Sequence, residues 1–181
     1  MNVEKFTIEG LVLITTRQFK DERGYFFESY NQKQLNEVIG IDLPFVQDNV
    51  SVSKKGVIRG LHLQAPPFGQ GKLVRVLKGS VIDVAVDIRK DSPTYGQHVE
   101  VLLSAENGRQ FWVPEGFAHG FSVLEDDTVF SYKCTNYYNP GAEMGIRFDD
   151  PDLSINWQVE NKIVNIKDGE LPFLVNFASP F

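Results

Sequence analysis

The sequence predicts an all-β protein, built as a sandwich or a barrel. Short runs of apolar and β-branched residues recur along most of the chain, and Gly, Pro, Asn and Asp punctuate them. Many short strands separated by turn residues are typical of antiparallel sandwiches and barrels. The length of 181 residues, without repeats or a low-complexity linker, predicts one domain over residues 1–181.

Ten segments carry the strand pattern. They are 10–16, 24–30, 46–53, 57–64, 72–78, 80–88, 98–103, 110–113, 119–123 and 128–135. Gly79 lies between the fifth and the sixth segment, and its position predicts a tight hairpin there.

One helix is expected in the first third of the chain. Asn31 is a suitable N-cap, Leu35, Val38 and Ile39 form an apolar stripe, and Gly40 ends the helix. The last quarter contains four spaced prolines and is expected to be irregular, with one or two short helices packed on the β core.

Composition excludes several classes of function. The formal charge of −6 and the pI near 5.1 argue against a nucleic-acid partner or a basic membrane surface, although local Arg and Lys side chains can still bind a small anion. Cys134 is the only cysteine, so neither an internal disulfide nor a thiolate metal site is possible. The polar N-terminus and the absence of a long apolar run predict a soluble, cytoplasmic protein.

A histidine stands out in the segment 57–64. Strict alternation places His62 on one face of the strand with Gly60 and Gln64. Imidazole titrates near neutral pH, and it serves in proton transfer and in metal binding. A histidine that is merely hydrogen-bonded in a barrel wall is the third possibility.

A second histidine follows a turn. Pro114-x-Gly116-x-x-His119, together with a glycine six residues before His62, resembles the paired motifs of the cupin superfamily. This resemblance implies a cupin-type double-stranded β-helix (jelly roll) with a few short peripheral helices. Metal-binding cupins usually have a second histidine two residues after the first, and here that position is Gln64. His98 lies in a separate strand, so a cupin-like barrel without metal is favoured.

Three further side chains could replace a metal in catalysis. Lys72 opens a strand, where it could stabilise an oxyanion or simply be a solvated lysine. Tyr132 shares a face with Phe130 and Cys134, and it is either a core residue or a proton donor. Asp168 is either a turn residue or the group that orients an imidazole.

Arginines and amides near aromatic residues suit a nucleotide diphosphate, since guanidinium groups bind phosphate and rings stack on bases. Arg23, Gln47, Asn49 and Arg59 fit this description, and a salt-bridged barrel rim is the alternative. Arg59 has the opposite alternation parity to His62. Both can face one cavity only if the strand bulges at Gly60 or if Arg59 bends around the rim.

With these motifs together, the chain closely resembles the dTDP-4-dehydrorhamnose 3,5-epimerase family over about residues 3–174. The shared motifs are Asp21-x-Arg23-Gly24-x-Phe26-x-Glu28, Gln47-x-Asn49-x-Ser51, Arg59-Gly60-Leu61-His62-x-Gln64, Lys72-Leu73-Val74, Pro114-x-Gly116-Phe117-x-His119-Gly120-Phe121, Tyr132, Tyr137-Tyr138-x-Pro140 and Lys167-Asp168.

The resemblance implies a metal-free and cofactor-free homodimer with an exchanged N-terminal segment. In the family roles, His62 is the base, Asp168 orients it, Tyr132 is the opposing acid and Lys72 stabilises an enolate oxygen. The dTDP-sugar substrate would be contacted by Arg23, Phe26, Glu28, Gln47, Asn49, Arg59, His119, Glu143 and Lys167, and Tyr138 would stack on thymine.

The expected reaction converts dTDP-4-dehydro-6-deoxy-D-glucose to dTDP-4-dehydro-L-rhamnose by proton exchange at C3 and C5. Three alternatives remain open from the sequence: an epimerase of only one carbon, a non-catalytic sugar-nucleotide-binding cupin, and a metal-dependent cupin enzyme.

Overall fold

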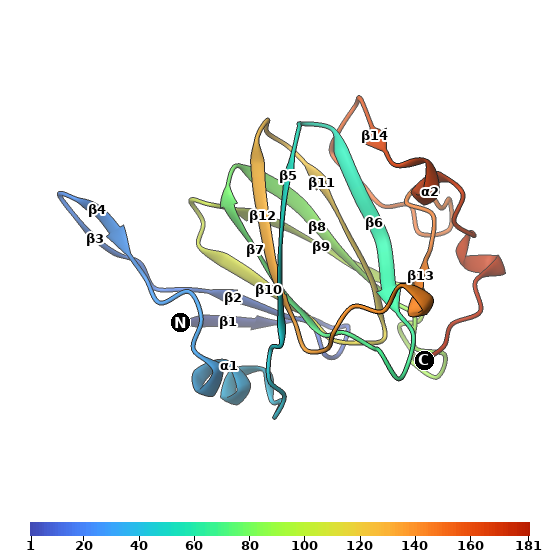
Figure 1. Cartoon of the computed structure of the whole chain (residues 1–181), viewed down its shortest axis with the longest axis horizontal. Coiled ribbons are helices and arrows are strands. Elements are labelled where there is room, and N and C mark those ends of the chain that lie inside the picture. Colours follow the sequence, from blue (N-terminus) through green and yellow to red (C-terminus); the bar gives the residue numbers. More distant parts are fainter.

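The structure is a computed structural model that describes residues 1–181, and two β-sheets packed face to face form its body (Figure 1). The first sheet has the spatial order β1 (Asn2–Lys5), β2 (Val12–Thr15), β10 (Arg109–Val113), β7 (Lys72–Lys78), β12 (Thr128–Cys134) and β5 (Gln47–Ser53). The second has the order β13 (Glu143–Gly145), β6 (Val57–Gln64), β11 (Phe117–Val123), β8 (Ser80–Asp87) and β9 (His98–Ser104). β14 (Ile163–Val164) pairs parallel to β6, and every other pair of strands is antiparallel.

The all-β prediction is confirmed, and most expected strands lie within one or two residues of their predicted bounds. The segment 24–30 is the exception, because only β4 (Gly24–Phe26) forms there. It pairs with β3 (Phe19–Asp21) in a hairpin that projects from the sandwich (Figure 1). The strands β1, β3, β13 and β14 were not predicted, since they are short and carry no clear apolar alternation.

The predicted hairpin at Gly79 is wrong. The chain does turn tightly there, and Gly79 has a φ of 78°, which a glycine adopts readily. However, β7 pairs with β10 and β12 in the first sheet, whereas β8 pairs with β11 and β9 in the second. The turn therefore passes the chain from one sheet to the other. Turn residues indicate where a chain reverses, but they do not determine which strands become neighbours.

The predicted helix is confirmed as α1 (Gln32–Ile39). The Asn31 side chain accepts a hydrogen bond from the backbone N–H of Gln34, and Gly40 ends the helix in the left-handed conformation. Leu35 is buried on the outer face of the first sheet, against Leu73 and Trp112 among others. The last quarter of the chain is irregular, as expected, but it contains three short helices instead of one or two: η1 (Pro140–Ala142), α2 (Ile166–Gly169) and η2 (Leu174–Asn176).

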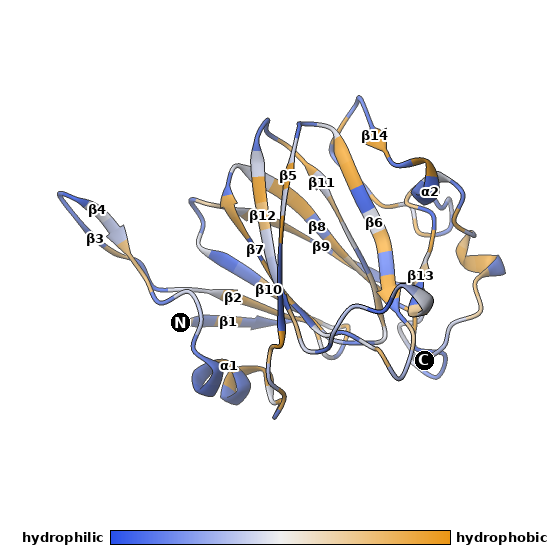
Figure 2. Cartoon of the chain, viewed as in Figure 1, coloured by the Kyte–Doolittle hydropathy of each residue, from blue (hydrophilic) through white to orange (hydrophobic).

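Both faces of the second sheet are covered. Its inner face packs on the first sheet through a cluster that includes Val81, Phe121 and Phe130. Its outer face is covered by the C-terminal segment, which contributes Trp157 and Phe177 among others. Hydrophilic positions interrupt the hydrophobic colouring of β6 in Figure 2. Polar side chains on the inner face therefore need partners or a cavity. No helix of the structure has the length and apolar character to span a membrane.

Candidate active site

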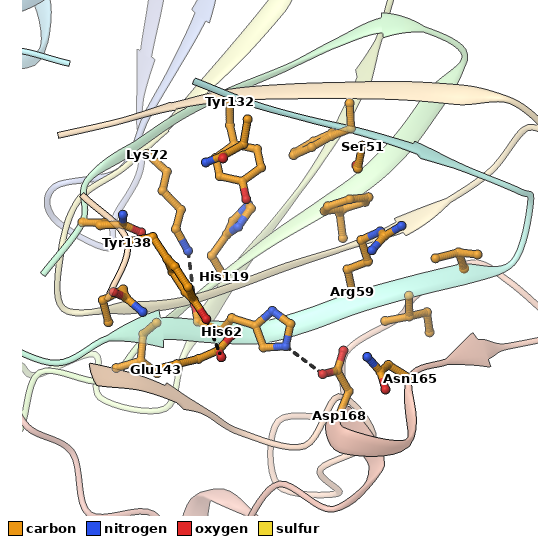
Figure 3. Close-up of a pocket in the computed structure, with 18 of the residues that line it drawn as sticks. Ser51, Arg59, His62, Lys72, His119, Tyr132, Tyr138, Glu143, Asn165 and Asp168 are labelled. Carbon is orange, nitrogen blue, oxygen red and sulfur yellow. Dashed lines mark hydrogen bonds and ion pairs between the residues drawn. The ribbon is translucent and has the colours of Figure 1, made fainter. Parts of the chain in front are cut away.

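A cavity of about 600 Å³ lies between the two sheets (Figure 3). Nine of the predicted site residues line it: Asn49, Arg59, His62, Lys72, His119, Tyr132, Tyr138, Glu143 and Asp168. They come from both sheets, from the loop that contains Tyr138 and from α2, and they span residues 49–168 of the sequence. Folding therefore brings the motifs together in one place.

A bulge in β6 explains how Arg59 and His62 line the same cavity although strict alternation would place them on opposite faces. His119 of β11 lies opposite His62, and Phe121 lies opposite Arg59, so two residues of β6 face one residue of β11. Gly60 occupies the bulge with a φ of 133°, and a Cβ there would lie 2.5 Å from the Cα of Gly120. An extra residue reverses the alternation of a strand. Arg59 and His62 consequently both line the cavity, which was one of the two conditions stated from the sequence.

Asp168 holds the imidazole of His62. The His62 Nε2 lies 2.8 Å from Asp168 Oδ1, and the backbone N–H of Gly60 donates to Asp168 Oδ2 at 3.3 Å. The Asp168 side chain is only 8 % exposed, whereas that of His62 is 36 % exposed. Burial works to raise the pKa of the Asp168 carboxyl, but the hydrogen bonds and charge of His62 and the Gly60 N–H outweigh it, so this pKa is lowered. An ionised Asp168 that accepts the Nε2 proton leaves Nδ1 as the free nitrogen of His62.

Asn165 starts the short helix α2, on which Asp168 lies. Its side chain accepts a hydrogen bond from the backbone N–H of Lys167, and this cap begins the turn. The position of Asp168 therefore depends on a local capping residue and on the β6 bulge.

Lys72 is buried, so the interpretation as a solvated lysine is wrong. It is the first residue of β7, and its Nζ lies 3.4 Å from the backbone oxygen of His62 (Figure 3). Burial lowers the pKa of the Lys72 ammonium, and the charges of Cys134, Asp83 and Glu143 oppose this effect. The site thus contains a lysine side chain that has little contact with water.

Tyr132 faces the cavity from β12, on the sheet opposite to His62 (Figure 3). Phe130 and Phe121, whose ring centroids are 4.0 Å apart, also line the cavity. Burial raises the pKa of the Tyr132 hydroxyl, so this group keeps its proton at neutral pH. A protonated phenol is suited to donate a proton.

The structure reveals a second histidine–carboxylate pair, which the sequence analysis missed. His119 Nε2 lies 2.9 Å and 3.0 Å from the two carboxylate oxygens of Asp83 on β8. Asp83 is fully buried, and its pKa is raised by this burial, against the opposing effect of His119 and Lys72. The signal was a carboxylate flanked on both sides by apolar residues, Val81-Ile82 before Asp83 and Val84-Ala85-Val86 after it.

A loop contributes Tyr138 to the wall of the cavity. The Tyr138 hydroxyl donates to Glu143 at 3.0 Å, and the Tyr138 backbone N–H donates to Gln47 at 2.9 Å. Gln47 also donates to Asn49 at 3.1 Å, so it supports the site although it does not line the cavity. The hydrogen bond from the Tyr138 hydroxyl to Glu143 raises the pKa of that hydroxyl.

Besides Gln47, four predicted residues do not line the cavity of their own chain. Arg23 and Phe26 belong to the projecting β3–β4 hairpin, and the Arg23 side chain is 84 % exposed and paired with Asp21 at 2.6 Å. Glu28 and Lys167 are exposed and do not line the cavity either.

Metal ligands are not gathered at one point of the fold. No group of three or more His, Cys, Asp or Glu side chains is arranged to hold a metal ion. His98, the third histidine, pairs with Glu100 on β9.

Comparisons with known proteins agree on one family. The family model described as dTDP-4-dehydrorhamnose 3,5-epimerase matches residues 5–176. An enzyme of that name from Shigella flexneri is 54 % identical over 168 residues, which cover 93 % of each chain. The structure of a dTDP-6-deoxy-D-glucose-3,5-epimerase from Legionella pneumophila in complex with dTDP-4-keto-L-rhamnose superimposes with a TM-score of 0.94 at 49 % identity, covering 98 % of this chain and 94 % of that one. A 3'-monoepimerase from Streptomyces bikiniensis in complex with dTDP-quinovose gives a TM-score of 0.89 at 32 % identity, covering 94 % and 86 %. These likenesses confirm the predicted cupin-type fold.

Proposed function

Because the chain belongs to the dTDP-4-dehydrorhamnose 3,5-epimerase family, we propose a chemical role for each polar side chain that faces the cavity. The chain is an isomerase that converts dTDP-4-dehydro-6-deoxy-D-glucose to dTDP-4-dehydro-L-rhamnose. The two carbons that change configuration, C3 and C5, both adjoin the C4 ketone, which acidifies their hydrogens. The protein must therefore supply a base, an acid and stabilisation for an enolate.

His62 is the proposed base, and its contact with Asp168 is the observation that carries the assignment. The free Nδ1 of His62 takes a proton from C3 or C5, and the electron pair of the broken C–H bond moves into the enolate. Asp168 fixes the tautomer and stabilises the imidazolium that forms, as the carboxylate does in a serine-protease triad. A positioned base typically contributes about 10²–10⁴-fold to the rate.

Lys72 and Tyr132 complete the proposed reaction. The Lys72 ammonium stabilises the negative charge that develops on the C4 oxygen, and a buried positive group is more effective there than one in water. Tyr132 lies on the opposite sheet to His62, so it can return a proton to the other face of the carbon. Removal from one face and return to the other inverts the centre. Between turnovers His62 releases the proton it has taken up to solvent, and Tyr132 regains a proton from solvent.

The remaining side chains bind the nucleotide sugar in this proposal. Arg59 neutralises the diphosphate, while Asn49 and His119 contact the substrate through hydrogen bonds. Gln47 and Lys167 do not line the cavity, and we propose that they contact parts of the substrate that extend beyond it. Tyr138 stacks on thymine, and its hydrogen bond to Glu143 holds the ring in position. The cavity draws on residues from β5 to α2, which supports the proposal that residues 1–181 form one catalytic domain.

We propose that Arg23, Phe26 and Glu28 serve the cavity of a second copy of the chain. The β3–β4 hairpin projects away from its own sandwich (Figure 1), and Phe26, the last residue of β4, is 71 % exposed. An exposed aromatic residue beside an arginine suits the base and phosphates of a nucleotide bound elsewhere. A homodimer with an exchanged N-terminal segment would bring these groups to the substrate. The cytoplasm stays the predicted location.

Turnover in heavy water tests the reaction. The product should acquire solvent deuterium at both C3 and C5. His62→Ala should abolish incorporation at both carbons while dTDP still binds, and Tyr132→Phe should slow inversion more than it slows exchange. Deuterium at one carbon would contradict the two-centre reaction, and no deuterium in the wild type would contradict the enzymatic assignment.

Complementation tests the exchanged hairpin. Arg23→Ala and His62→Ala each impair every site when alone. Co-refolded together, they form heterodimers in which one cavity has both groups intact, so about one quarter of all sites should regain activity. If the mixture shows no gain, Arg23 serves its own chain and the exchange is refuted.

A further inference from the structure

Ser51 has no function in the reaction described above, yet its side chain points into the cavity. Asn49, Ser51 and Ser53 occupy the same face of β5 because they alternate with the outward residues 50 and 52. Figure 3 shows Ser51 on β5 above Arg59. Ser51 lines the cavity, but it takes part in none of the protein's hydrogen bonds that hold its neighbours.

The neighbours of Ser51 on β5 are both satisfied. Asn49 accepts from Gln47 at 3.1 Å and donates to the sulfur of Cys134 at 3.6 Å. Ser53 accepts from Nε and Nη2 of Arg59, both at 3.2 Å. The hydroxyl oxygen of Ser51 is buried and has no partner. Buried polar groups are nearly always paired, so an unpaired hydroxyl in a cavity wall indicates a ligand atom at this point.

The strand register gives the position of Ser51 relative to the reacting groups. Asn49 lies opposite Tyr132, and Ser51 lies opposite Phe130, two residues further along β5. Ser53, two residues beyond, holds Arg59. A strand rises by about 3.4 Å per residue, so Ser51 lies about 7 Å along β5 from the level of Tyr132. The direction of this displacement is toward Ser53 and Arg59. Ser51 is thus between the proposed acid for the sugar and the proposed diphosphate ligand.

The chemistry of Arg59 limits what can sit beside Ser51. Two guanidinium nitrogens of Arg59 are used on Ser53, and Nη1 has no protein partner. Guanidinium can only donate hydrogen bonds, and an anionic phosphate oxygen accepts from guanidinium and from a hydroxyl alike. If the sugar of the substrate lies at the level of Tyr132, the phosphate attached to its C1 oxygen falls within the roughly 7 Å that separate Tyr132 from Ser51 along the strand.

We propose that the Ser51 hydroxyl donates a hydrogen bond to the phosphate directly attached to the sugar, which is the terminal phosphate of dTDP. This inference rests on the proposed function of the cavity. It makes Ser51 the residue that fixes the junction between sugar and diphosphate, and so sets how far the sugar reaches toward Tyr132 and His62.

Binding of two nucleotides to Ser51→Ala tests the proposal. Calorimetric titration with dTDP and dTMP separates the contacts, because dTMP lacks the terminal phosphate. The variant should bind dTDP about tenfold more weakly, while its affinity for dTMP should stay within about twofold of the wild type. Ser51→Thr keeps the hydroxyl and should restore dTDP binding. Ser154→Ala, at an exposed position, is the matched control and should change neither affinity.

Equal weakening for both nucleotides, or unchanged dTDP binding, overturns the assignment of Ser51. Deuterium incorporation by the wild type is measured on the same preparation. If the wild type exchanges at C3 and C5 and the Ser51→Ala variant binds dTDP with normal affinity, only the role of Ser51 is refuted. A wild type without exchange refutes the proposed function instead.

Discussion

Replacement of Asp168 by Asn tests the proposed base most directly, because it removes a charge and almost no volume. Asp168 receives two hydrogen bonds, from His62 Nε2 at 2.8 Å and from the Gly60 N–H at 3.3 Å. Both donors point at carboxylate oxygens. An amide has one oxygen and one NH₂ group, so in either orientation it directs N–H toward a donor.

The structure allows the size of the effect to be worked out. A hydrogen bond to a charged group contributes about 1.5–3 kcal/mol. The imidazolium formed during catalysis also loses its counter-charge, a Coulomb energy of about 4 kcal/mol at 4 Å with an effective dielectric constant near 20. If the NH₂ faces His62, the imidazole takes the other tautomer and presents a protonated Nδ1 to the substrate, which in a serine-protease triad costs about 10⁴-fold. We therefore expect kcat to fall by about 10²–10⁴-fold, since each 1.36 kcal/mol is tenfold.

The assay is the initial rate of deuterium incorporation at C3 and C5 under saturating substrate, with dTDP affinity measured in parallel. The affinity should change little because Asp168 does not touch the nucleotide in the proposed complex. Asp149→Asn, which loses a surface pair with Arg147, is the control and should retain full activity. A kcat for Asp168→Asn within about threefold of the wild type would refute the role of Asp168 and the base assignment that rests on it.

Three other substitutions probe the polar interior. Lys72→Met should lower kcat by about 10²–10³-fold with unchanged dTDP affinity, because it removes enolate stabilisation; unchanged single-turnover rates would contradict this role. Asp83→Asn should shift the alkaline limb of the kcat–pH profile to lower pH, since the Asp83 charge helps to hold Lys72 protonated against burial; an unmoved limb would contradict the coupling. Asp87→Asn should lower the free energy of unfolding at pH 7 by about 2 kcal/mol, measured by urea denaturation. Although burial opposes it, hydrogen bonds from Arg89, Ser92 and Thr94 lower the pKa of Asp87 from 3.8 to about 2. Its contribution is therefore present above pH 4 and lost as pH falls through about 2, so the difference between variant and wild type should vanish over that range.

The strands could be predicted because their signals are local. Alternation and turn residues gave the bounds of β6 and β7 to the residue, and capping chemistry gave α1 between Asn31 and Gly40. Pairing between strands is not local, so a tight turn at Gly79 was interpreted as a hairpin although its strands lie in different sheets. The residues of β3 bury nothing in their own chain, and they therefore leave no apolar periodicity to detect, whereas β4 covers only the first three residues of the predicted strand 24–30.

The chemistry of the site was more predictable than its geometry. His62, Lys72 and Tyr132 were identified from their residue types and strand positions, and the structure places all three around one cavity. The bulge at Gly60 depends on a close contact with Gly120 of another strand, which alternation within one strand cannot reveal. Asp83 was missed for the same reason, because its partner His119 comes from a neighbouring strand.

The two histidine–carboxylate pairs lie opposite each other in register, and their burial separates their roles. His62 is 36 % exposed to the cavity, whereas the side chains of His119 and Asp83 are 8 % and 0 % exposed. A base must reach its substrate and exchange protons with solvent between turnovers, and only His62 meets both conditions. The buried His119–Asp83 pair lacks the exchange with solvent, but it places a carboxylate whose charge works to raise the pKa of Lys72 against burial. The His62–Asp168 pair therefore moves protons, and the His119–Asp83 pair maintains the electrostatic field in which they move. Exchange at C3 and C5 should depend on His62 far more steeply than on His119.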